Sequence, residues 1–218
     1  MISRRPARPA RPARVRGFTL IELMVGITLM ALLLSLAAPA FMTMISNTKL
    51  RSHAESVFNG LQLARAEALK RNTTVQFRLV TDLTSGCTGE TDGGAWVVSL
   101  FDVTGKCNTA PDLTTSPTSA GFNAAINPLI LQKKEVGDPN LLVTAGQAGI
   151  CFNGLGQLTS VAGICTTANT TISVTAPTAG TCKASGGDIR CMDIRIASGG
   201  MVRFCDPAVS DANDPRHC

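Results

Sequence analysis

The sequence predicts an α+β protein, in which a long membrane-spanning N-terminal helix continues into an amphipathic helix packed on a small antiparallel β-sheet domain. Two observations indicate this fold class. The first part of the 218-residue chain is a long apolar run that gives way to an apolar repeat of three and four residues. Short segments rich in alternating apolar residues, separated by Gly-, Thr- and Ser-rich stretches, fill the remainder. A helix followed by several antiparallel strands is an α+β arrangement.

The apolar run extends from Phe18 to about Ile45, which exceeds the ~20 residues that a helix needs to cross a bilayer core. In lipid every backbone polar group must be paired within the segment, so the run is expected to be helical. Before Gly17 there are six arginines and no acidic residue: Arg4, Arg5, Arg8, Arg11, Arg14 and Arg16. Positive charge at the end of a span keeps that end cytoplasmic, so the residues after position 50 are expected on the opposite side.

Glu22 is the one charged residue of the apolar run. A charged side chain inside or beside a membrane span is costly and indicates a function. At the cytoplasmic edge of the bilayer this carboxylate requires a positive partner. The nearest candidate is the amino group that cleavage after Gly17 would create, on the same chain or on a neighbouring one.

The formal net charge of +5 comes from the segment before Gly17. Without its six arginines the chain has 14 basic and 15 acidic side chains, a net charge of −1. The basic character is therefore a membrane-topology signal, and it gives no support for nucleic-acid binding.

Residues 46–72 are predicted to form an amphipathic helix. Its apolar positions are Leu50, Ala54, Val57, Phe58, Leu61, Ala64, Ala68 and Leu69. Glu67 and Arg71 are spaced for an i,i+4 ion pair near its end, which is expected at Asn72. Within the preceding apolar helix, Pro39 removes a backbone hydrogen bond and is expected to cause a kink.

Residues 73–218 are predicted to form the β domain. A half-buried strand is expected where Val75, Phe77 and Leu79 alternate with polar residues. Further strands are expected at 95–102, 129–133, 141–144, 150–152, 155–159, 171–174, 190–196 and 201–205. The segments 81–94 and 103–127 are expected to be loops. Asn153-Gly154 and Gly199-Gly200 are expected to form the turns of two hairpins, and 206–218 is expected to be an irregular tail.

The eight cysteines all follow the apolar run: Cys87, Cys107, Cys151, Cys165, Cys182, Cys191, Cys205 and Cys218. In an exported domain an even number of cysteines predicts disulfides. Of the 105 possible pairings, we expect each cysteine to pair with its neighbour along the chain: 87 with 107, 151 with 165, 182 with 191, and 205 with 218. Zinc binding is the alternative, but the chain has no Cys-x-x-Cys pair and two histidines. No metal and no cofactor are expected.

The segment Gly17-Phe18-Thr19-Leu20-Ile21-Glu22 resembles the leader cleavage site of type IV pilins and type II secretion pseudopilins. The resemblance implies cleavage between Gly17 and Phe18 by a prepilin peptidase and N-methylation of Phe18. It also implies that Glu22 pairs with the N-terminus of a neighbouring subunit during filament assembly. The expected domains are then a leader (1–17), an assembly helix (18–45), the amphipathic helix (46–72) and a disulfide-containing β domain (73–218).

This segment has two simpler explanations. A plain signal anchor would carry Glu22 by chance. A cleaved secretory signal has an apolar region of only 7–15 residues and a small-residue site at its far end, which fits this long run less well.

Three further segments resemble the GspH/FimT family, which includes FimT- and FimU-type minor pilins and minor pseudopilins. They are Leu61–Ala68 followed by Thr74-Val75, Phe152–Gly156, and Gly200–Pro207. The resemblance implies a pilin fold and a structural subunit that is a single-pass inner-membrane protein with a periplasmic domain before it enters a filament. Other pilins or pseudopilins, an inner-membrane assembly platform and membrane lipid are the implied partners. The cysteine-rich C-terminal features favour the pilus branch, but a secretion system remains open.

DNA binding is the alternative function, since some FimT-type pilins bind DNA through arginines of the C-terminal motif. Arg203 occupies one such position, whereas Met201 stands at the other. Arg190 and Arg195 on the preceding predicted strand are further candidates for phosphate contacts. An exported enzyme is a third possibility, but no Gly-x-Ser-x-Gly, His-Glu-x-x-His or phosphate-binding glycine loop is present, so no enzymatic activity is expected.

Overall fold

The computed structural model describes residues 17–135 and 137–218. In these ranges the chain forms one long helix, α1 (Leu20–Arg71), eight strands and one 3-10 turn, η1 (Lys183–Ser185). The strands are β1 (Val75–Val80), β2 (Ala95–Ser99), β3 (Ile130–Glu135), β4 (Leu142–Ala145), β5 (Gly149–Phe152), β6 (Thr170–Thr175), β7 (Met192–Ile196) and β8 (Val202–Cys205). The arginine-rich part of the expected leader lies outside the described residues.

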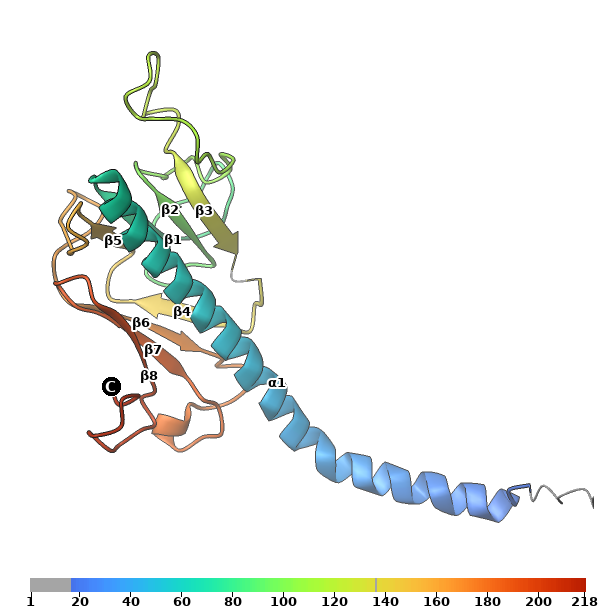
Figure 1. Cartoon of the computed structure of the whole chain (residues 1–218). Helices are drawn as coiled ribbons and strands as arrows, with labels where there is room; N and C mark the ends of the chain where they lie inside the picture. Colours follow the sequence, from blue (N-terminus) through green and yellow to red (C-terminus); the bar gives the residue numbers. More distant parts are fainter. Residues whose placement is uncertain (1–16, 136) are drawn as a thin grey trace, which may run out of the picture. The chain divides into compact units, whose positions relative to one another are not determined.

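The strands form two antiparallel sheets of four strands each. Sheet A has the order β3-β2-β1-β5 and sheet B the order β4-β6-β7-β8. The chain divides into two compact units, Met1–Phe41 and Met42–Cys218, and both sheets belong to the second. Within that unit, the later part of α1 lies along the two sheets (Figure 1) and shares one hydrophobic core with them. The expected α+β class is confirmed, and the expected domain boundaries remain predictions.

The apolar stripe of α1 faces this core. Six of the eight expected positions are buried in it: Leu50, Ala54, Val57, Leu61, Ala64 and Ala68. Phe58 is half-buried and stacks on Phe204 of β8, with 4.6 Å between ring centroids. The prediction is wrong for Leu69, whose side chain is 49% exposed. Ala64 and Ala68 are on the face of the helix that contacts the sheets. With 3.6 residues per turn, Leu69 is rotated by about 100° from Ala68 and so points away from that face.

Gly60 allows the helix to approach sheet A closely. A Cβ atom at this position would lie 2.9 Å from Cζ3 of Trp96 and 3.0 Å from Cε2 of Phe77. These two rings stack on each other, with 5.6 Å between their centroids, and they form the surface of sheet A that α1 contacts. The absence of a side chain at Gly60 therefore helps to set the distance between helix and sheet.

Gly60→Val is expected to destabilise the second unit by about 1–3 kcal/mol, because the added carbons must displace Trp96 or Phe77. The measurement is thermal unfolding of the full chain in detergent, followed by tryptophan fluorescence. Ala66→Val, at an exposed position of the same helix, is the control and should change the stability by at most about 0.5 kcal/mol. Equal effects of the two substitutions would contradict the packing argument.

The end of α1 is fixed by ion pairs and by the backbone of the next residue. Glu67 accepts hydrogen bonds from Arg71 at 2.6 Å and from Lys70 at 3.2 Å, so the expected i,i+4 pair is present. Burial alone would raise the pKa of Glu67, but the hydrogen bonds from Arg71 and Lys70 outweigh it and lower that pKa. Asn72 has a φ of 49°, the left-handed conformation that commonly ends a helix.

Strand β1 is buried on both faces, so the expectation of a half-buried strand is wrong. Gln76 and Arg78, on the face away from α1, are only 5% and 8% exposed. The segment between β1 and β3 folds over this face and forms a second apolar cluster with it. Arg78 also forms an ion pair with Asp102 of that segment. Polar residues at alternate positions therefore did not indicate contact with solvent.

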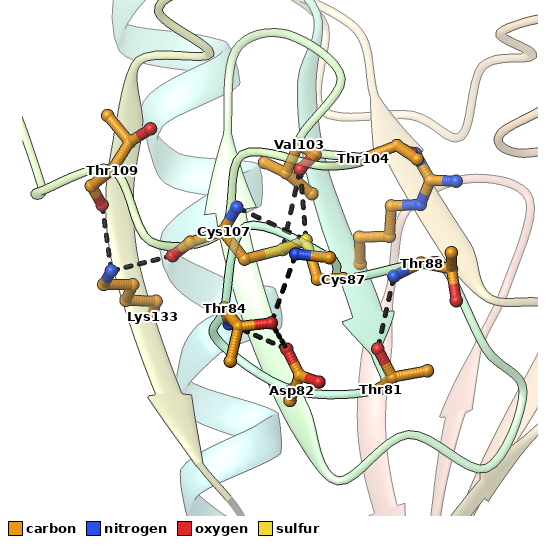
Figure 2. Close-up of a disulfide and its surroundings, with 12 residues drawn as sticks. Thr81, Asp82, Thr84, Cys87, Thr88, Val103, Thr104, Cys107, Thr109 and Lys133 are labelled. Carbon is orange, nitrogen blue, oxygen red and sulfur yellow. Dashed lines mark hydrogen bonds between the residues drawn. A yellow bond between two sulfur atoms is a disulfide. The ribbon is translucent and has the colours of Figure 1, made fainter.

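The Cys87–Cys107 disulfide holds this covering segment together (Figure 2). Both cysteines are buried, and their Cα atoms are 6.1 Å apart. Lys133 of β3 donates hydrogen bonds from Nζ to the main-chain oxygens of Cys107 at 2.7 Å and Thr109 at 2.9 Å. The segment is thus attached to sheet A by an apolar cluster and by cationic side chains of β1 and β3, while the disulfide joins its two loops.

The other six cysteines also form disulfides in the expected neighbour order. The pairs are Cys151–Cys165, Cys182–Cys191 and Cys205–Cys218, with Cα separations of 6.0, 5.4 and 5.1 Å. A carboxylate oxygen of Asp193 and the sulfurs of Cys205 and Cys218 lie within 4.8 Å of one another, a cluster that could be considered for a metal ion. Because these sulfurs are bonded to each other, they are not the thiolates that a metal would need.

The two expected hairpins have different outcomes. Strands β7 and β8 pair antiparallel around the turn at Gly199-Gly200, as predicted. The expected arm 155–159 does return antiparallel to β5, but as a single bridge between Phe152 and Leu158 and not as a full strand. The N–H of Asn153 donates to the main-chain oxygen of Gln157, and that of Thr159 to Cys151, each at 2.9 Å. The Leu158 N–H instead donates to the main-chain oxygen of Ser198 at 2.9 Å, which draws this segment toward the β7–β8 turn.

Candidate functional site

The first candidate site is the start of α1. The helix begins at Leu20, and the hydroxyl oxygen of Thr19 accepts a hydrogen bond from the N–H of Glu22 at 3.3 Å. Thr19 therefore acts as the N-cap, a position where threonine satisfies a backbone donor that has no partner within the helix. Glu22 lies in the first turn, where the helix dipole favours negative charge.

Sequence reasoning did not single out Thr19. A threonine three residues before a glutamate is the sequence pattern of a capping box, so this signal was available. With Thr19 as its cap, the helix begins two residues after Phe18. It therefore places the carboxylate of Glu22 within one helical turn of the main chain that cleavage after Gly17 would expose.

The side chains of α1 before Met42 form an apolar surface. The helix is long and apolar enough to cross a membrane, with a mean hydropathy of 2.3 over an 18-residue window that has no burial within the protein. Its hydroxyl groups are satisfied internally: Thr28 donates to the main-chain oxygen of Met24 at 3.0 Å, and Ser35 to that of Leu32 at 2.8 Å. Lipid or other apolar helices are the surroundings that such a surface requires.

The second candidate site is the set of C-terminal arginines. Arg195 of β7 and Arg203 of β8 are directly opposite each other in the sheet. Arg195 also donates a hydrogen bond to the main-chain oxygen of Cys218. Arg190 is not part of this pair, since it precedes β7 and its N–H donates to Oδ1 of Asn47 at 2.7 Å. The structure therefore brings together two of the three arginines that the sequence suggested.

Other basic residues near the C-terminus add little to this pair. Arg216 forms an ion pair with Asp214 at 2.7 Å. The hydrogen bonds from Arg216 lower the pKa of Asp214 to about 2. Arg216 is thus already neutralised by a nearby carboxylate.

Comparison with known protein families assigns the chain to a family. The family described as "Type II transport protein GspH" matches residues 53–200, more than half of the sequence. The chain belongs to the GspH family. A second family, described as "Prokaryotic N-terminal methylation motif", matches residues 12–38, which include Gly17, Phe18 and Glu22. The resemblance inferred from the sequence is therefore confirmed.

Solved structures similar to this GspH-family protein include two crystal forms of the type IV minor pilin FimU of Pseudomonas aeruginosa strain PAO1. The first has 15% sequence identity and a TM-score of 0.45, covering 76% of this chain and 94% of that one. The second has 15% identity and a TM-score of 0.43, with coverages of 74% and 97%. A comparison with curated proteins gives no match.

Membership of the GspH family establishes the general class of the protein. It is a pilin-like structural subunit, a minor pilin or pseudopilin with an N-terminal methylation motif, and not an enzyme. Its apolar N-terminal helix fits a membrane-anchored pilin.

The expected kink at Pro39 remains a prediction for this GspH-family helix. Position 39 lies within the uninterrupted α-helix Leu20–Arg71. The side chain of Pro39 lies outside the described residues.

Proposed function

We propose that this protein is cleaved between Gly17 and Phe18, methylated at Phe18, and assembled into a type IV pilus or a type II secretion pseudopilus. The observation that carries the proposal is Glu22, the one charged residue of an exposed apolar helix that matches the N-terminal methylation motif. A prepilin peptidase, an inner-membrane assembly platform and other pilins or pseudopilins are the implied partners.

The mechanism of assembly follows from two physical needs of the N-terminal helix. Each Å² of its apolar surface that neighbouring helices shield from water stabilises the assembly by about 25 cal/mol. The carboxylate of Glu22 needs a cation in these surroundings, and the Phe18 amino group of an adjacent subunit supplies one. A buried ion pair of this kind is best suited to fixing register, because a shifted helix would leave both charges unpaired.

The proposed topology places the arginine-rich leader in the cytoplasm and the second unit in the periplasm of a bacterial cell. The positive charge before the span supports this orientation. The four disulfides agree with it, since disulfides form and persist in the oxidising periplasm and are rare in the cytosol.

Gly17→Leu is expected to leave the precursor uncleaved in the membrane, because a branched side chain replaces the residue at the cleavage site. The measurement is an immunoblot of membrane fractions, with intact-mass spectrometry to identify the N-terminal residue. Gly26→Leu is the matched control: a Cβ there would contact no atom within 4 Å, so cleavage should proceed normally. A mature-sized product from Gly17→Leu would contradict the proposed processing.

DNA binding remains the alternative function. Its support is the pair Arg195 and Arg203, which face each other across β7 and β8. Nucleic-acid binding by phosphate contacts usually needs a larger cluster of cations. A gel shift with the full mature chain in detergent, compared with Arg203→Ala, tests this function: salt-sensitive binding that the substitution removes would support it.

A further inference from the structure

The Arg195–Arg203 pair belongs to a row of three side chains across sheet B. Thr171 of β6 is opposite Arg195, and Arg195 is opposite Arg203. Like charges directly opposite each other in a sheet are destabilising. Arg195 has a protein partner, the main-chain oxygen of Cys218, whereas Arg203 has no polar partner among the residues that the structure describes. The Arg203 guanidinium is therefore the available positive charge of the row, and Asp193, opposite Cys205, is on the same face one pair along.

These side chains line a groove of about 350 Å³, together with Asn169, Thr170, Ile196, Ala197 and Met201. None of the described residues that line it is acidic. Asn169 uses its side-chain oxygen to accept from the N–H of Ser198 at 2.7 Å, which leaves its amide group as a donor. The groove is thus rich in donors and suited to an oxyanion.

Exposed apolar side chains adjoin the groove. Met201, which lines it, is 58% exposed, and Leu155 is 72% exposed. Their neighbours Gly200 and Gly156 meet so closely that a Cβ at Gly200 would overlap the carbonyl oxygen of Gly156. Leu69 of α1 lies at the same contact, 3.3 Å from the Cβ position of Gly156. Met201 therefore lies beside the two arginines, and Leu155 and Leu69 are exposed next to Gly156, where its main chain meets Gly200.

We propose that this surface binds an acidic segment of another protein, whose carboxylate lies between Arg195 and Arg203 and whose apolar side chains contact Met201 and Leu155. Arginine pairs with carboxylate through strong, directional hydrogen bonds. Exposed apolar patches beside polar groups are typical of protein–protein contacts. A protein segment fits better than DNA, because Arg195 and Arg203 are the only cations among the described residues that line the groove. The next cation, Arg65, already donates to the main-chain oxygen of Gly156 at 3.2 Å. The chain without its leader also has a net charge of −1.

We expect this other protein to be a neighbouring subunit of the filament, an identity that rests on the proposed function, whereas carboxylate binding by the groove does not. The test therefore uses peptides and the full mature chain in detergent micelles. The probe is a capped peptide, Ser-Leu-Glu-Leu-Ser, and the comparison peptide has glutamine in place of glutamate. We expect saturable binding of the glutamate peptide, with a Kd of about 1 mM or tighter, and binding of the glutamine peptide that is about tenfold weaker.

Arg203→Gln is expected to weaken binding of the glutamate peptide about tenfold, while Arg203→Lys, which keeps the charge, retains more of it. Lys183→Gln is the matched control, since Lys183 is an exposed cation in η1 outside the groove. Thermal unfolding verifies that the variants remain folded. Equal binding of the two peptides, no binding of either, or an unchanged affinity in Arg203→Gln would overturn the proposal. Arg203-dependent binding of a short DNA duplex without peptide binding would also overturn it and assign the groove to nucleic acid.

Discussion

Replacing Glu22 with alanine is expected to abolish incorporation of the chain into filaments, while the protein remains folded, cleaved and inserted in the membrane. The substitution removes the one charge of the apolar helix and leaves the amino group of the adjacent subunit without a partner. Losing one member of a buried ion pair typically costs about 3–5 kcal/mol, a factor of roughly 100 to 4,000 in the equilibrium for each contact. The second unit does not depend on Glu22, so its stability should not change.

The measurement is the ratio of filament-bound to membrane-bound protein, from immunoblots of sheared and cell fractions. Glu22→Asp keeps the charge and should retain part of the assembly. Thr28→Ala is the matched control on the same helix, because the Thr28 hydroxyl is satisfied by the main-chain oxygens of Met24 and Val25. Filaments that contain Glu22→Ala at the normal level would show that this carboxylate does not direct assembly.

Replacing Cys87 and Cys107 together with serine is expected to destabilise the second unit by about 3 kcal/mol. A disulfide that closes a loop of this size contributes roughly that amount by restricting the unfolded chain, and its cysteines are separated by 20 residues. The loss also loosens the segment that covers Gln76 and Arg78 on sheet A. Denaturant unfolding of the full chain in detergent measures the change, and limited proteolysis should cut first within residues 81–112.

The matched control is the double substitution of Cys205 and Cys218, whose separation of 13 residues gives a similar loop. That disulfide holds the irregular tail rather than a segment over an apolar cluster. We therefore expect a smaller loss of stability, with cleavage confined to residues 206–218. Equal losses for the two pairs would mean that covering sheet A adds nothing to the effect of loop closure.

Features with a local cause could be predicted from the sequence. The helix follows from an apolar run and a repeat of three and four residues, both of which depend on side chains close together along the chain. The β7–β8 hairpin follows from Gly199-Gly200 between two apolar segments. The family could also be recognised, because the segment from Gly17 to Glu22 is a continuous motif that needs no folded context.

Tertiary structure decided which surfaces are covered and which distant side chains meet. Gln76 and Arg78 are buried because a segment beginning after β1 folds back over them, and strand alternation contains no information about such a cover. Arg195 meets Arg203 while Arg190 does not, because strand register determines which side chains are opposite each other. The sequence alone determined the helix, the single charge of its apolar run and the β7–β8 hairpin, since these depend on neighbours along the chain. The covered face of sheet A and the basic groove depend on contacts between segments far apart in the chain, which only the folded structure specifies.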